Sequence, residues 1–193
     1  MSASDADDAM AARFPLLFAP QRWEWGGLDV RFSTAPPPQD LVTNIHVIGS
    51  CDGGVVLCRS LRDRWFLPGG TRERDEGIDD CAARELLEEA GAQIVSPLRW
   101  IGAHYAVSDL SEPYRPWQPH PNKAWLWCAA EVALVAQPTN PPGGEQVVEV
   151  RVAPPGEAEE LLRQRDGGRS WMADLLALAR SQDTETMQAP RPE

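Results

Sequence analysis

The stretch from Arg64 to Gly91 constrains the fold more than any other part of the sequence, because its character changes abruptly from strand to helix. Arg64 to Leu67 is a short, largely apolar run. Pro68-Gly69-Gly70 ends it, since proline removes a backbone donor and the glycines permit positive φ. Ile78 to Ala90 then carries helix formers with acidic residues in its first turn, and Gly91 follows as a helix stop. The sequence predicts a strand, a glycine-containing loop and a helix over Ile78–Ala90.

Apolar and β-branched runs on both sides of this unit predict a sheet. Leu41 to Gly49 and Val55 to Arg59 are separated by a segment whose Asp52-Gly53 suits a tight hairpin turn. Further strands are expected at Leu98–Val107, Ala124–Val135 and Val147–Val152, and amphipathic helices at Glu157–Arg165 and Trp171–Arg180. Strands and helices in this order predict an α/β fold in which helices cover both faces of a mixed sheet.

The length of 193 residues and the 42% of hydrophobic residues suit one domain with a substantial core. We expect that domain over residues 41–181, with an N-terminal extension over 14–40 packed on it. Residues 1–13 are small and acidic and residues 182–193 are polar, so both are expected to be disordered tails. The sequence has no secretory signal and no apolar run near the ~18 residues of a membrane span, which predicts a cytoplasmic protein.

Charge narrows the class of partner. The 29 acidic against 18 basic residues give a net charge of −11, which argues against binding to nucleic-acid polymers. An acidic protein that acts on anionic small molecules needs bound cations to reverse the local sign of the potential. The cysteines, at positions 51, 58, 81 and 128, are spread through apolar segments without the clustering of a zinc site, and are read as reduced core residues.

Three glutamates of the predicted helix share one face. At ~100° of rotation per residue, Glu85, Glu88 and Glu89 project within one sector, and apolar residues such as Leu86 and Leu87 point away from it. Like charges at this spacing repel by roughly 0.2–0.5 kcal/mol per pair. A hard dication would relieve that repulsion, because magnesium prefers oxygen ligands. The alternative is an ordinary solvated face of an amphipathic helix.

The segment from Gly70 to Ala92 resembles the Nudix box. Gly70 is followed after five residues by Glu76, and after seven more by Arg84-Glu85-Leu86-Leu87-Glu88-Glu89-Ala90-Gly91-Ala92, which matches every fixed letter of G-x5-E-x7-R-E-U-x-E-E-x-G-U. Ala92 departs from the bulky aliphatic residue that the family prefers at the last position. The resemblance implies a Nudix-type α/β/α sandwich with a mixed β-sheet, in which the box forms a loop, a helix and a loop.

The same resemblance implies roles for individual residues. Glu85, Glu88 and Glu89 would bind Mg²⁺, with Mn²⁺ as a substitute, and Arg84 would orient these glutamates. Gly70, Glu76 and Gly91 would shape and brace the loops of the box. The implied reaction is the attack of water on a diphosphate linkage in a nucleoside diphosphate joined to another moiety, or in a related small molecule.

Two questions stay open at this stage: which residue removes the proton from water, and whether the domain hydrolyses its ligand. Glu85 is one candidate base, and Glu145, in the loop before the Val147 strand, is the other. A non-catalytic Nudix domain that senses a nucleotide metabolite is the alternative to an enzyme. The intact box favours the hydrolase, because loss of a box glutamate would be expected in a sensor.

Substrate contacts are expected in the loop from Tyr105 to Trp125, where Tyr105, Tyr114 or Trp117 would stack a base. Arg72 is the leading candidate for a phosphate contact, with Arg74, Arg115 and Lys123 as others. Most of the eight tryptophans are expected to fill the core or an interface. Trp125 and Trp127 alternate along one strand and would share a side that is buried or faces a second copy in a homodimer. The identity of the diphosphate substrate does not follow from the sequence.

Overall fold

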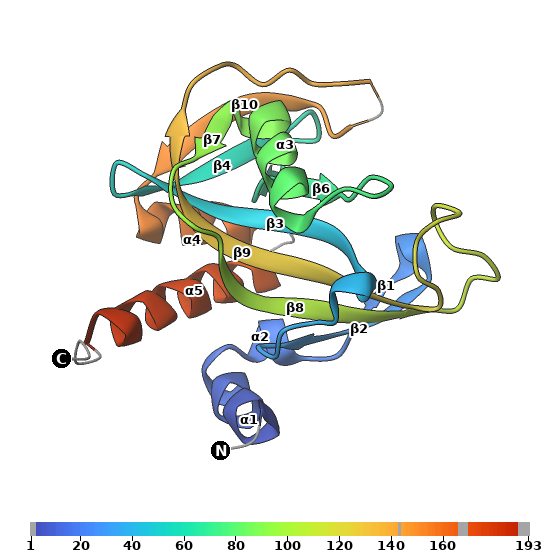
Figure 1. Cartoon of the computed structure of the whole chain (residues 1–193). Coiled ribbons are helices and arrows are strands. Elements are labelled where there is room, and N and C mark those ends of the chain that lie inside the picture. Colours follow the sequence, from blue (N-terminus) through green and yellow to red (C-terminus); the bar gives the residue numbers. More distant parts are fainter. Residues whose placement is uncertain (1–2, 143, 166–169, 189–193) are drawn as a thin grey trace.

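The computed structural model describes residues 3–142, 144–165 and 170–188, and Figure 1 shows that α3 covers one face of a curled sheet while α4 and α5 cover the other. The helices are α1 (Ala3–Arg13), α2 (Pro15–Phe18), α3 (Ile78–Ala90), α4 (Pro155–Gln164) and α5 (Trp171–Gln188), with single 3-10 turns η1 (Glu24–Gly26) and η2 (Gln39–Leu41). These layers are the α/β/α sandwich that the sequence predicts.

The sheet is mixed, as predicted. Its strands are β1 (Gln21–Trp23), β2 (Leu28–Ser33), β3 (Val42–Cys51), β4 (Gly54–Ser60), β5 (Trp65–Phe66), β6 (Gly69–Thr71), β7 (Ala92–Ile94), β8 (Arg99–Ser108), β9 (Asn122–Leu134) and β10 (Val147–Ala153). Within the described residues the main path runs β1-β2-β8-β9-β3-β4-β10, with β5 on β4, β6 on β3 and β7 on β9. Strands β3 and β9 run parallel at its centre, and the neighbouring pairs are antiparallel.

Alternation along β9 divides the core into two layers. Leu126 and Cys128 face α3 and pack with Leu86, whereas Trp127 and Ala129 face the opposite side, where the leucines of α5 pack. Because successive side chains of a strand point to opposite faces, one strand supplies both layers. The central position of β3 and β9 follows from this, since both of their faces are buried.

The N-terminal segment is ordered where we expected a disordered tail. Residues 3–13 form α1, and the carboxylate of Asp7 accepts hydrogen bonds from the Ser33 hydroxyl at 2.6 Å and from the Thr34 hydroxyl and amide at 2.7 and 3.1 Å. A short helix of low intrinsic stability is held here by contacts far away in the sequence. Residues 1–2 lie outside the described residues.

The C-terminal end of the domain also differs from the expectation. Helix α5 continues through Gln188, beyond the boundary that we placed at residue 181, so residues 182–188 are helical, and residues 189–193 lie outside the described part. The carboxylate of Asp183 pairs with Arg99 on β8 at 2.5 Å, which ties the last turns of the helix to the sheet. No helix in the described residues has the length and apolar character needed to cross a membrane.

The extension over 14–40 packs into the sheet and core. Strand β2 pairs with β8 along its length, with Val30 opposite Ala106. Leu17 of α2 is fully buried in the core layer beneath α5. The Asp174 carboxylate of α5 accepts hydrogen bonds from the Leu16 and Leu17 amides at 2.9 and 3.4 Å, which satisfies the free donors at the start of α2.

Two neighbouring leucines of α2 test whether this extension is part of the folding unit. Leu17→Ala should lower the free energy of unfolding by about 2–5 kcal/mol, because it opens a cavity in the core. Leu16→Ala should change it by about 0.5 kcal/mol or less, because Leu16 is 38% exposed. Urea denaturation followed by circular dichroism measures both values. Equal effects of the two substitutions would show that α2 does not belong to the cooperative core.

Candidate active site

Helix α3 is fixed at its C-terminal end, which sets the direction of its glutamates. Gly91 has a φ of 60°, the left-handed conformation that suits a helix C-cap, and its amide bonds back to Leu87. A Cβ at this position would lie 2.1 Å from the Ala136 carbonyl oxygen, so only glycine fits. The Gly91 carbonyl in turn accepts the amides of Val135 and Ala136 at 2.8 and 3.0 Å, which docks the end of the helix on the sheet.

The carboxylate face of α3 is more buried than the polar face of an ordinary amphipathic helix. Glu85 and Glu89 are only 9% and 8% exposed, while Leu87 on the far side is 39% exposed. The glutamates share one face of the helix, as the sequence predicts. Two of them are nevertheless more buried than Leu87, which the amphipathic pattern would place inside. Leu86 and Ala90 pack on the sheet, and the two buried glutamates lie at the edge of the same contact.

The glycine loop before the helix makes this burial possible. Strand β6 pairs with β3, with Gly70 opposite Ile45, and runs directly past the glutamates. A Cβ on Gly70 would lie 2.5 Å from the nearer carboxylate oxygen of Glu85, so a side chain there would displace the glutamate. The Gly69 amide donates a hydrogen bond to the Glu89 carboxylate at 2.8 Å. The loop and the helix therefore form one unit.

Arg84 holds the remaining carboxylates through its planar guanidinium group. Its Nε and Nη2 donate to the two oxygens of Glu76 at 2.8 and 3.0 Å, a bidentate pair. Its Nη1 donates to Glu85 at 2.8 Å and to Glu88 at 3.3 Å, and Nη2 also donates to the Thr71 carbonyl at 3.1 Å. This places Glu76 as a brace of the loop through Arg84.

The surroundings of the two buried glutamates disfavour their charged forms. Burial raises the pKa of Glu89 to about 8; the Gly69 hydrogen bond lowers it, and the charges of Glu85, Glu145 and Glu88 raise it further. Burial also raises the pKa of Glu85, against the opposing effect of the hydrogen bond from Arg84. A cation placed among these carboxylates would offset that repulsion.

A cavity of about 740 Å³ opens beside these groups. It is lined by Glu85, Glu88 and Glu89 of α3, by the 69–74 loop, by Glu145 and by aromatic residues of the 109–121 loop. Glu145 is exposed and comes from the loop between β9 and β10. The structure thus brings the two candidate bases, Glu85 and Glu145, to one cavity.

The residues fit a hard metal ion by the chemistry of their donors. In the described residues, no three His, Cys, Asp or Glu side chains form a ready-made metal cluster. Arg84 lies between Glu85 and Glu88, and Glu89 is hydrogen-bonded to Gly69. The donors that face the cavity are nevertheless carboxylate oxygens, which Mg²⁺ and Mn²⁺ prefer. Binding of an ion here would require these carboxylates to exchange their present partners for the metal.

The three predicted substrate contacts have different positions. Trp117 lines the cavity at its rim, 45% exposed, beside the Arg115 guanidinium. Arg72 also lines this cavity, and its guanidinium donates to the carbonyl oxygens of Glu76, Gln39 and Val42, so its role as a phosphate contact stays a prediction.

Tyr105 is not among the described residues that line this cavity. Its hydroxyl donates to the Ala35 carbonyl at 3.1 Å, and the cavities found in the described residues are lined by other side chains. Strand alternation explains the difference, because the neighbouring His104 is the residue of this pair that points to the buried aromatic side.

Tryptophans from distant segments form a cluster next to the box. Trp23 lies 4.7 Å from Trp125 and 6.1 Å from Trp171 between ring centroids, and Trp125 lies 5.7 Å from Trp25. Trp127 is buried, and its indole N–H donates to His104 at 2.9 Å. The expected shared side of Trp125 and Trp127 is therefore an intramolecular cluster.

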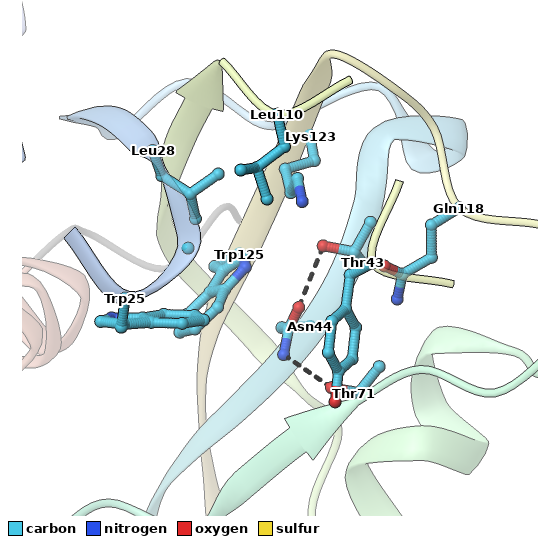
Figure 2. A pocket seen from close by; sticks show the side chains of 11 residues that line it. Trp25, Leu28, Thr43, Asn44, Thr71, Leu110, Gln118, Lys123 and Trp125 are labelled. Atoms are coloured by element: carbon cyan, nitrogen blue, oxygen red, sulfur yellow. Dashed lines mark hydrogen bonds between the residues drawn. The ribbon is translucent and has the colours of Figure 1, made fainter. Parts of the chain in front are cut away.

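A second cavity, of about 340 Å³, adjoins the first and was missed by sequence reasoning (Figure 2). The two cavities share Asn44, Thr71 and Tyr114. Asn44 accepts a hydrogen bond from Thr43 at 3.0 Å and donates one to Thr71 at 3.2 Å (Figure 2). In the sequence, only the apolar residues Trp25 and Leu28 of the extension hint at such a cavity. The other side chains that line it come from positions 43–44, 71 and 110–125, which are far away in the sequence.

Comparison with solved structures finds the same fold. A mutant of the Bacillus subtilis pyrophosphohydrolase BsRppH superposes with a TM-score of 0.61 at 17% identity, covering 89% of this chain and 99% of that one. A structure described as an ADP compounds hydrolase gives a TM-score of 0.50 at 17% identity, covering 76% of this chain and 75% of that one. Among curated proteins, none matches the chain.

The family follows from the sequence of the domain itself. Residues 41–177 match the family model described as the NUDIX domain, which is more than half of the 193 residues. The match contains the whole stretch from Gly70 to Ala92 and begins at the residue where we placed the start of the domain. The chain belongs to the Nudix hydrolase family, whose enzymes act on phosphoric anhydride bonds.

Proposed function

We propose that this protein hydrolyses a diphosphate linkage in a nucleoside diphosphate joined to another moiety, in a reaction that depends on Mg²⁺. The observation that carries the proposal is the convergence of Glu85, Glu88 and Glu89 on one open cavity, next to a glycine loop that leaves room for them. The similar fold of a pyrophosphohydrolase and of an ADP compounds hydrolase agrees with a phosphoric anhydride as the bond that breaks.

Different residues of the chain would bind the metal, position its ligands and exclude solvent. Glu85, Glu88 and Glu89 would hold the metal, which when bound polarises phosphate oxygens and lowers the pKa of the attacking water. Arg84 would position the carboxylates through its pairing with Glu76. Trp117 at the rim would help to keep solvent from the substrate.

Glu145 is the general base in this proposal. It is exposed, lines the cavity and makes no hydrogen bond or ion pair with the described residues. Glu85 is instead buried and bound to Arg84 at 2.8 Å. A carboxylate that is unpaired at the mouth of the cavity is better placed to accept a proton from water than one held by a guanidinium.

Removal of one metal-binding charge should remove the activity. Glu88→Gln or Glu89→Gln is expected to lower kcat/KM by about 10²-fold or more, since a neutral amide is a poor ligand for magnesium. The measurement is release of phosphate or nucleotide from a panel of nucleotide sugars, dinucleotides and nucleoside triphosphates with magnesium. Asp80→Asn on the same helix is the matched control, because Asp80 is exposed and lines none of the cavities described above. Wild-type turnover by both Gln variants would contradict the metal site.

Magnesium should stabilise the folded protein by mass action. At a concentration 100 times its Kd, an ion that binds only the folded state adds about 2.7 kcal/mol, which raises Tm by several degrees in a domain of this size. Thermal melts with and without magnesium measure the shift, and Glu89→Gln should reduce it. A wild-type melt that magnesium leaves unchanged would count against the site. A clear shift with nucleotide binding but no turnover on any substrate would instead identify a sensor.

The planar shape of the Arg84 guanidinium, and not only its positive charge, is expected to contribute to catalysis. Arg84→Lys keeps a cation but loses the bidentate pair with Glu76, so kcat should fall by about 10–100-fold while KM changes little. Steady-state kinetics over a range of magnesium concentrations, with circular dichroism as a check on folding, provide the test. An Arg84→Lys enzyme with full kcat would show that charge alone suffices.

A further inference from the structure

The second cavity has walls suited to a flat ring. Trp25 comes from the N-terminal extension and Trp125 from β9, and their rings lie on one side of the cavity, while Leu28 and Leu110 form aliphatic walls (Figure 2). Trp25 is 71% exposed, so its face is open to a ligand. Nucleobases stack favourably on aromatic side chains of this kind.

Lys123 is the only lysine of the chain, and the other 17 basic residues are arginines. It lies at the start of β9 and is only 8% exposed. It makes no hydrogen bond or ion pair with the described residues, and Figure 2 shows its ammonium group extending into the cavity. Burial lowers its pKa. An ammonium group at the wall of a cavity favours a ligand that brings acceptor atoms.

Gln118 presents a second donor without a partner. The residue is 9% exposed, and its side-chain Nε2 is buried without a hydrogen bond among the described residues. Its backbone amide bonds to the Arg115 carbonyl at 3.0 Å, which fixes the loop that carries it. Buried amide groups of folded proteins normally have partners. Two independent donors therefore line one cavity and lack acceptors.

The residues that line the cavity include no aspartate or glutamate. The cavity also meets the box cavity at Asn44, Thr71 and Tyr114, so one molecule can occupy both. We propose that this cavity binds the base of the substrate and selects an oxo-bearing base, of the guanine or uracil type, through donation from Lys123 and Gln118 to its exocyclic oxygen. Adenine and cytosine present an amino group at the corresponding edge, and a donor that faces a donor is penalised. This inference rests on the proposed function, since it assigns the nucleoside part of that substrate.

Binding of nucleoside monophosphates tests the preference without any hydrolysis. Isothermal titration calorimetry of the full chain with GMP, UMP, AMP and CMP, without metal, should give GMP or UMP a Kd at least about 10-fold below those of AMP and CMP. Equal affinities, a preference for the amino-bearing bases, or no binding would overturn the inference. The hydrolysis of a phosphoric anhydride would remain separately testable in each of those cases.

A pair of substitutions assigns the preference to the cavity. Lys123→Met retains the length of the side chain and should reduce the difference between GMP and AMP, with the donor of Gln118 left in place. Arg31→Met is the matched control, because Arg31 is an exposed basic residue on β2 and lines none of these cavities. A Lys123→Met protein that keeps the full preference would overturn the role of the lysine.

The single lysine allows a direct readout in the wild-type protein, should the variant fail to fold. Reductive methylation with ¹³C-formaldehyde labels only Lys123 and the amino terminus of the chain. Addition of GMP should shift the Lys123 methyl signal in the NMR spectrum, and AMP at the same concentration should shift it much less. A lysine signal that does not respond to GMP, or that responds equally to AMP, would contradict the proposal.

Discussion

The burial of an acidic helix face against the sheet is the constraint on which the rest of this structure depends. Glu85 and Glu89 lie in the contact between α3 and β6 with less than a tenth of their surface exposed. Such burial costs free energy unless each carboxylate finds a partner. Arg84 supplies one partner and the Gly69 amide another. The absence of a side chain on Gly70 provides the space, and the left-handed Gly91 fixes the helix in register.

The N-terminal extension completes the other side of the site. Trp23 stacks within a cluster that includes Trp125 of the central sheet and Trp171 of α5, so three distant segments share one packing contact. This contact holds Trp25 beside the second cavity. The extension therefore supplies part of the wall of the second cavity from outside the box.

Local sequence patterns predicted the helices, the strands and the box. Features that depend on contacts between distant parts of the chain were not predicted. The bounds of the box helix, Ile78–Ala90, agree with the structure because a glycine loop and Gly91 punctuate it locally. Helix α1 was not predicted because it is held in place by hydrogen bonds from residues 33–34 to the Asp7 carboxylate, which are far from it in the sequence. The substrate roles of Tyr105 and Arg72 stay predictions, and both side chains donate hydrogen bonds to backbone carbonyls in this structure. The second cavity is lined by side chains from the extension, β3, β6 and the 109–121 loop. No local sequence pattern indicates that these segments lie together.

The function proposed for this protein requires that the α3 carboxylates bind a divalent ion. Manganese, which has the same preference for oxygen ligands, allows that ion to be located by anomalous diffraction from crystals soaked in Mn²⁺. We expect a strong anomalous peak within about 2–2.4 Å of carboxylate oxygens of Glu85, Glu88 or Glu89. A peak at another group of residues, or no peak at saturating manganese, would contradict it.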